Sequence, residues 1–200
     1  MLLKRHRNRA KRPPEAIEQR PIFRDPRNFS LVVQTYQTMV FRYVFNMVHD
    51  YHLAEDLTQE IFAKVYRSLP TYNAKYPFSA WLLRIAHNHG IDHIRQRKLQ
   101  TVSYDSLAND EALAESHRTL QSAATYTEDA AQRLVIQEAI YSLSVDYRSV
   151  IILRYLGGVK LEEIAYILGI PIGTVKSRIN RARQILQQQL RQSKPAARKG

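Results

Sequence analysis

The sequence predicts an all-α protein of two small helical domains joined by a flexible acidic linker, the C-terminal domain containing a helix-turn-helix. Glycine and proline are sparse, at 6 and 8 of 200 residues, which favours long uninterrupted helices. Apolar residues recur three or four positions apart, the spacing of one helix face. Residues 100–129 break this pattern with a stretch rich in Ser, Thr and Ala that holds six acids and one arginine. We therefore place the linker there.

The composition favours a polyanionic partner. The formal net charge is +12 and the isoelectric point is near 10.0, which favours nucleic acid first and an anionic membrane surface second. Cysteine is absent, which excludes disulfides and thiolate metal sites and fits a cytoplasmic protein. The strongest apolar cluster, Val150–Leu153, is too short to cross a bilayer. No apolar signal core follows the basic residues 1–12, so we expect no secretory signal.

Residues 1–28 form a predicted basic flexible arm. They hold nine Lys or Arg and three acids, and four prolines exclude one continuous helix. Such an arm either keeps the protein soluble or contacts nucleic acid without sequence preference, and the sequence leaves both interpretations open.

The first predicted domain, residues 29–99, opens with an apolar helix over Phe29–His49. A break at Asp50–His52 separates it from an amphipathic helix over Leu53–Leu69. On one face of this second helix the apolar residues are Leu53, Ala54, Leu57, Ile61 and Val65. Another face carries a polar stripe of Asp56, Gln59, Glu60 and Ala63. By itself the stripe is either a solvated surface or a surface for a protein partner.

A loop over Leu69–Pro77 then precedes a basic helix over Ala80–Arg97, with Ser79 as its expected N-cap. One side of this helix carries Arg84, Asn88 and Arg95, with Trp81 and Asp92 near its edge. Aromatic residues beside a basic helix suit single-stranded nucleic acid, whose bases stack while cations hold the backbone. The alternative is that the aromatic residues of this segment complete a core: Tyr72, Tyr76 and Trp81.

His89 and His93 on this helix are four residues apart and could share a metal ion. Both lie on the side assigned to the core, and no acid cluster completes a site. We therefore expect no metal and no cofactor.

The second predicted domain, residues 130–192, has a helix-turn-helix within Leu161–Leu186. Gly169 suits the left-handed position just past the first helix, and Pro171 cannot extend that helix. The other expected elements are helices over Glu128–Leu143 and Asp146–Leu156, a Gly157-Gly158 turn, a helix over Leu161–Leu168, a last helix from near Gly173, and a basic tail over 193–200.

The last helix has a narrow apolar stripe of Val175, Ile179, Ala182 and Leu186. Opposite the stripe lie Ser177, Asn180, Arg181 and Gln184, flanked by Thr174 and Lys176, with Arg178 and Arg183 nearer its edges. From Pro171 to Gly200 there are eight Lys or Arg and no Asp or Glu. Such a helix suits the DNA major groove, the alternative being an ordinary basic surface helix.

Two parts of the chain resemble conserved regions of bacterial sigma factors. Ala54–Leu69 (AEDLTQEIFAKVYRSL) and Phe78–Lys98 (FSAWLLRIAHNHGIDHIRQRK) resemble their second region, and Tyr147–Arg183 resembles their fourth. The lack of a recognisable third domain between them is typical of the extracytoplasmic-function group. The resemblance implies a non-catalytic subunit that binds core RNA polymerase and guides it to promoter DNA, duplex and single-stranded. It also implies a stress or envelope-response regulon and control by an anti-sigma factor.

The resemblance further implies roles for single residues and for the linker. The polymerase-binding residues would be Asp56, Gln59, Glu60 and Phe62. The minus-ten element would be held by Tyr72, Tyr76, Arg84, Asn88, Asp92 and Arg95. The minus-thirty-five element would be read by Thr174, Lys176, Ser177, Asn180 and Arg181. Independently of the resemblance, the position of Arg178 and Arg183 near the edges of the stripe predicts that they reach phosphates. The acidic linker would follow polymerase surfaces that are shaped for nucleic acid.

Two other classes of function stay open at this point. A free-standing helix-turn-helix repressor or activator would dimerise and bind duplex DNA without polymerase. A histidine-metal enzyme would bind a metal ion when purified.

Overall fold

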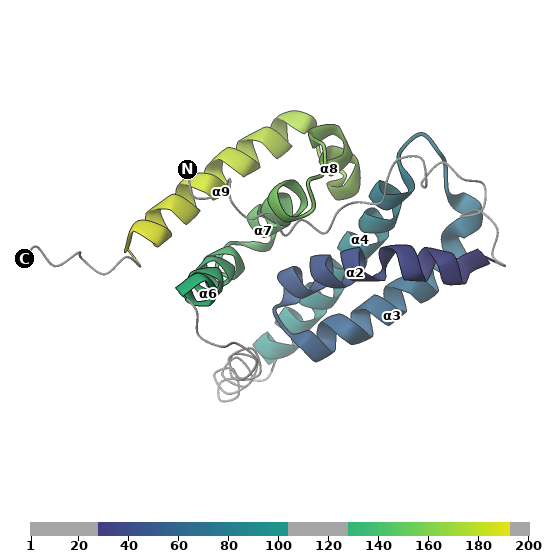
Figure 1. Ribbon diagram of the computed structural model, residues 1–200, viewed down its shortest axis with the longest axis horizontal. Coiled ribbons are helices and arrows are strands. Elements are labelled where there is room, and N and C mark those ends of the chain that lie inside the picture. Colours follow the sequence, from purple (N-terminus) through teal and green to yellow (C-terminus); the bar gives the residue numbers. More distant parts are fainter. Residues whose placement is uncertain (1–27, 104–127, 193–200) are drawn as a thin grey trace, which may run out of the picture.

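The computed structural model describes residues 28–103 and 128–192, and every element within them is helical (Figure 1). The predicted basic arm apart from Asn28, the basic tail and most of the acidic linker lie outside the described residues. The elements are α2 (Phe29–Val48), α3 (Tyr51–Ser68), the short 3-10 turn η4 (Leu69–Thr71), α4 (Phe78–Ser103), α6 (Glu128–Tyr141), α7 (Val145–Ile151), the π-helical turn η5 (Ile152–Leu156), α8 (Leu161–Leu168) and α9 (Ile172–Gln192). The prediction of two all-α domains is confirmed.

The N-terminal domain packs α2, α3 and α4 against one another. Its largest fully buried side chains come from all three helices: Tyr36, Met47, Leu57, Ile61, Phe78 and Leu82. On α2 the buried residues recur every three or four positions, because one face of a helix with 3.6 residues per turn meets its neighbours.

Two adjacent residues make the turn from α2 to α3. His49 takes the left-handed conformation, with φ 58° and ψ 31°, and its backbone N–H donates to the carbonyl of Phe45. Asp50 then caps α3 by accepting a hydrogen bond from the N–H of Leu53 at 3.0 Å. The break is shorter than the predicted Asp50–His52, because α3 begins at Tyr51 directly after this cap.

The start of α4 differs from the prediction. The helix begins at Phe78, and the carbonyl of Pro77 accepts from the N–H groups of Ala80 and Trp81 at 3.0 and 3.1 Å. Ser79 lies inside the first turn and is 2% exposed, so its predicted role as N-cap is wrong. Phe78, the first residue of α4, is fully buried, and its ring packs against that of Tyr36 with centroids 5.3 Å apart, so the helix begins earlier than predicted, at a core residue.

The C-terminal domain holds α8 and α9 against α7 and η5. The helix α8 has the predicted bounds, and Gly169 follows it in the left-handed conformation, with φ 65° and ψ 33°. Its backbone N–H donates to the carbonyl of Ala165, which ends the helix and turns the chain into α9. The glycine predicted at this turn is therefore confirmed.

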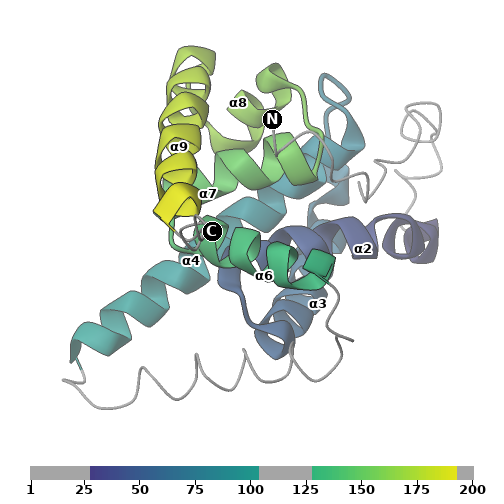
Figure 2. The ribbon, with the colours of Figure 1, turned by 60° about the vertical axis from the view of Figure 1, so that its left-hand side comes forward.

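The two domains also contact each other. The helix α8 packs on α4, and α2 contacts α6, α7 and η5. Figures 1 and 2 both place α8 beside the first turns of α4, whereas the last turns of α4 extend away from the other helices in Figure 2. Among the described helices, none combines the length and the apolar composition that a bilayer span requires.

Candidate nucleic-acid and protein interfaces

The predicted polar stripe of α3 is exposed at Asp56, Gln59 and Glu60. A network from two helices holds the last of these. His89 Nε2 lies 2.6 Å from Glu60 Oε2, and Lys64 Nζ lies 2.7 Å from His89 Nδ1. Because an ammonium can only donate, Nδ1 accepts from Lys64, and the neutral ring carries its proton on Nε2 and donates it to Glu60. The side chain of Glu60 is 61% exposed and that of His89 is 13% exposed, so a nearly buried imidazole holds an accessible carboxylate.

Phe62 does not belong to this exposed stripe. It is 6% exposed and meets the ring of Phe29 edge-on, with centroids 6.3 Å apart. The physical reason lies in the helix itself, since two steps of about 100° turn Phe62 roughly 200° away from Glu60. The structure assigns Phe62 to packing between α2 and α3.

The loop before α4 contains two aromatic residues with different surroundings. Tyr72 packs against Phe78 and Trp81, each at a centroid distance of 5.2 Å, and its hydroxyl donates to the carbonyl of Tyr76 at 3.0 Å. Trp81 is 7% exposed. These contacts give Tyr72 and Trp81 a part in the core and in the shape of the loop.

Tyr76 instead meets the C-terminal domain. Its ring stacks on that of Tyr166 from α8, with centroids 3.8 Å apart and planes 15° apart. The guanidinium of Arg84 lies 4.8 Å from the centre of the same Tyr166 ring. The remaining predicted residues of this surface, Asn88, Asp92 and Arg95, are exposed along α4.

His87, on α4, is half-buried and contacts α2. Its Nδ1 lies 2.8 Å from the hydroxyl of Tyr43. Burial lowers the pKa of His87 to about 4; Arg95 and Arg178 act in the same direction and Asp146 opposes them. Burial also raises the pKa of Tyr43 above its ordinary value. The neutral imidazole and the neutral phenol are therefore the forms present at pH 7.

The exposed face of α9 is basic and free of acids. Val175, Ile179, Ala182 and Leu186 are buried as predicted, and these residues of the opposite face are exposed: Lys176, Ser177, Asn180, Arg181, Arg183 and Gln184. Ser177 Oγ donates to the carbonyl of Thr174 at 3.0 Å, and Arg181 Nη1 donates to Gln184 Oε1 at 3.4 Å. Lys176 and Asn180, and likewise Ser177 and Arg181, are thus exposed pairs spaced by about one helical turn.

Arg178 is placed differently from the other cations of α9. Its two terminal nitrogens each donate to Asp146 at 3.2 Å, and its side chain is 26% exposed. Asp146 lies at the start of α7, so this ion pair joins two helices of the C-terminal domain. Thr174 is also only half exposed. Sequence spacing could not reveal the pairing, because Asp146 and Arg178 are 32 positions apart.

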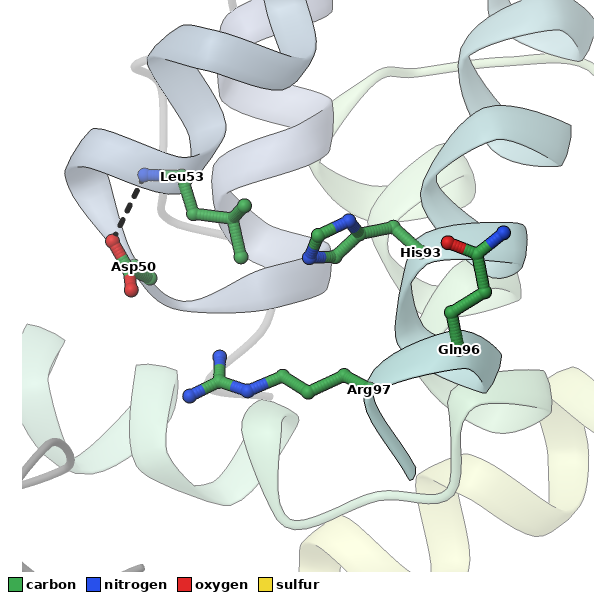
Figure 3. Close-up of a pocket in the computed structure, with 5 residues that line it drawn as sticks. All are labelled: Asp50, Leu53, His93, Gln96 and Arg97. Atoms are coloured by element: carbon green, nitrogen blue, oxygen red, sulfur yellow. Dashed lines mark hydrogen bonds between the residues drawn. The ribbon is translucent and has the colours of Figure 1, made fainter. Parts of the chain in front are cut away.

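A pocket of about 350 Å³ lies where α3 begins and α4 nears its end (Figure 3). It is lined by Asp50, Leu53, His93, Gln96 and Arg97. Figure 3 shows His93 and Arg97 extending from α4 towards the start of α3, where Asp50 already caps the helix. The pocket contains none of the predicted site residues.

Comparison with known proteins finds matches to both helical domains. The family model for Sigma-70 region 2 matches residues 32–100, and that for Sigma-70 region 4 matches residues 133–186. The chain is 36% identical to the ECF RNA polymerase sigma factor SigW of Bacillus subtilis over 82% of this chain and 89% of the relative. It is 34% identical to the RNA polymerase sigma-H factor of Pseudomonas aeruginosa over 83% of this chain and 88% of the relative.

Two solved structures share the fold. One is the sigma factor RpoE of Bartonella quintana in complex with the anti-sigma factor NepR, with a TM-score of 0.66 and 25% identity over 84% of this chain and 99% of that one. The other is CnrH in complex with the cytosolic domain of CnrY, with a TM-score of 0.62 and 20% identity over 90% and 98%. The sequence and fold comparisons together show that this chain belongs to the extracytoplasmic-function group of RNA polymerase sigma factors.

Proposed function

We propose that the chain is a non-catalytic, cytoplasmic subunit that brings core RNA polymerase to the promoters of a stress or envelope-response regulon through three separate surfaces. The observation that carries the proposal is the exposed face of α9, which presents cations, amides and hydroxyls without one acid. That face belongs to a helix-turn-helix whose turn has the geometry of a Gly169 cap. Each of the three surfaces has its own support.

The polymerase-binding surface is the α3 stripe of Asp56, Gln59 and Glu60. Its exposure, and the hydrogen bond that holds Glu60 in place, support this assignment. A carboxylate held by a partly buried donor loses less conformational freedom when a cationic partner binds it. Phe62 lies on the opposite, buried side of α3, where its contact with Phe29 helps to hold α3 against α2.

The minus-ten surface runs from the loop before α4 along the exposed side of that helix. Its members are Tyr76, Arg84, Asn88, Asp92 and Arg95, with Tyr72 shaping the loop. A ring that already stacks on another ring, close to a guanidinium, has the two groups that single-strand binding uses.

The minus-thirty-five surface is the exposed face of α9. We assign base contacts to Ser177, Asn180 and Arg181, which project away from the apolar stripe, and to Thr174 and Lys176, which flank them near the N-terminus of α9. Arg183 is exposed near the edge of the face and suits phosphate. Arg178 can contact phosphate only if its guanidinium group leaves the carboxylate of Asp146, to which it donates in this structure.

Run-off transcription tests the proposal as a whole. Purified chain added to core polymerase and a library of genomic fragments should give transcripts that start at defined sites. A free-standing repressor or activator would instead bind duplex DNA tightly without polymerase and give no transcripts with core enzyme alone.

A double substitution tests the polymerase surface. Asp56→Ala with Gln59→Ala should leave the helix content unchanged and weaken retention of the chain on immobilised core polymerase. Glu55→Ala is the matched control, because Glu55 is an exposed acid of the same helix about a quarter turn from the centre of the stripe. Equal retention of the double variant and the control would contradict the assignment.

An anti-sigma factor is the partner we propose for the free chain. The support is the fold shared with a sigma factor that was solved together with its anti-sigma factor. Co-purification from the native organism before and after envelope stress would test it. A chain that stays unpartnered in unstressed cells would refute it.

A further inference from the structure

The contact between the two domains covers part of the proposed minus-ten surface. Tyr76, from the loop, and Arg84, from α4, both contact one ring of the C-terminal domain, that of Tyr166. Tyr166 lies on α8, the first helix of the helix-turn-helix. The promoter-facing side chains of α9 are not involved in this contact and remain exposed.

The Tyr166 ring meets the same chemistry that an unpaired base would meet. A base offers a flat π-face that stacks on an aromatic ring and attracts an arginine. Tyr166 offers a flat ring, stacked on Tyr76 at 3.8 Å and lying 4.8 Å from the guanidinium carbon of Arg84. A ring and a base cannot occupy this site together, because the stacking distance leaves no space between Tyr76 and Tyr166.

A second contact holds the domains together away from this site. Arg148, on α7, donates to the backbone carbonyl of Met47 at the end of α2. The ring of Tyr141, on α6, stacks on His49 with centroids 4.8 Å apart. The domain interface therefore has contacts at the end of α2 as well as at the Tyr166 ring.

We propose that Tyr166 is an internal stand-in for an unpaired promoter base, and that it occupies the Tyr76–Arg84 site until the domains separate. The inference rests on the proposed role of Tyr76 and Arg84 in holding the minus-ten strand. While the two domains are in contact, a residue of the C-terminal domain fills the site, so single-stranded DNA must displace Tyr166. Duplex binding by α9 needs no such displacement.

The test measures binding of the free full-length chain to a short fluorescent single-stranded DNA of randomised sequence and to its duplex form. Tyr166→Ala should bind the single strand about 5- to 150-fold more tightly than wild type, which corresponds to the roughly 1–3 kcal/mol of one stacking contact. Tyr166→Phe keeps the ring and should bind as wild type does. All three proteins should bind the duplex equally.

Further variants separate the possible outcomes. Tyr166→Leu keeps apolar volume on α8 without a flat face, so it should repeat the gain of Tyr166→Ala even if the alanine variant folds poorly. Equal single-strand binding by wild type and Tyr166→Leu, with weaker binding by Tyr76→Ala, would overturn the stand-in while leaving the minus-ten surface intact. A gain that persists when Tyr76→Ala is added to Tyr166→Leu would instead remove Tyr76 from that surface, and the proposed stand-in with it.

Discussion

Lowering the pH should destabilise this protein through His87, and the size of the effect follows from its surroundings. Burial lowers the pKa of His87 from 6.5 to about 4. The unfolded chain therefore takes up a proton below pH 6.5 that the folded chain refuses until about pH 4. Stability is fully present above pH 6.5 and is lost progressively as the pH falls to 4. At about 1.4 kcal/mol per pKa unit, the full loss is about 3 kcal/mol, and about 2 kcal/mol is lost by pH 5.

The matched comparison is the variant His87→Gln. Glutamine keeps a polar group near the Tyr43 hydroxyl but has no titration in this range. Urea titrations of both proteins at pH 8 and pH 5 give the change in the free energy of unfolding for each. The wild-type loss should exceed that of the variant by about 2 kcal/mol.

Equal losses in the two proteins would refute this account of His87. The result also bears on the domain contact, because two of the charges that act on the ring, Asp146 and Arg178, belong to the C-terminal domain. If acid first separates the domains, the wild-type protein should lose its interdomain contact at a higher pH than the one at which its helix content falls.

Four further substitutions test single positions. In holoenzyme, Arg181→Ala should relax the preference at one or two base pairs of the minus-thirty-five element by about 1–3 kcal/mol. Arg183→Ala should weaken all promoter variants alike and lower the salt slope by about one, and a uniform loss for Arg181→Ala would contradict base readout. Gly169→Ala should lower the free energy of unfolding by about 1–2 kcal/mol, because a Cβ has space there but φ is 65°; an unchanged urea midpoint would refute this. His89→Ala should weaken polymerase retention by about 0.5–1.5 kcal/mol by releasing Glu60, and retention equal to wild type would show that Glu60 needs no support.

Helix spacing allowed most of the fold to be predicted. The helix α8 has the expected bounds, and the buried stripe of α9 is the expected one. These features depend on the periodicity of one helix and on the backbone freedom of Gly169, both of which are local properties. Local patterns misplaced Ser79, because the packing of Phe78 against Tyr36 decided where α4 starts.

The site was predictable only where it depended on one helix. The exposure of Asp56, Gln59 and Glu60 follows from the periodicity of α3, and the same periodicity argues against Phe62. The partners across helices did not follow, because a helical pattern gives the angle of a residue about its own axis and not its neighbour. His89 beside Glu60 and Tyr166 on Tyr76 are contacts of that kind.

The bonds of Arg148 affect how readily the two halves can part. Its guanidinium donates to three carbonyls, but those of Tyr141 and Leu143 lie in its own domain and only that of Met47 lies in the other. A cation that lost every acceptor on separation would hold the halves together through the penalty of a stranded charge. Arg148 keeps two of its three acceptors and the ring of Tyr141, whose centre lies 4.3 Å from the guanidinium carbon. For Arg148, separation therefore breaks only the hydrogen bond to Met47, so the energetic resistance to separation lies in the packing of α8 on α4 and in the ring contacts of Tyr166 and Tyr141.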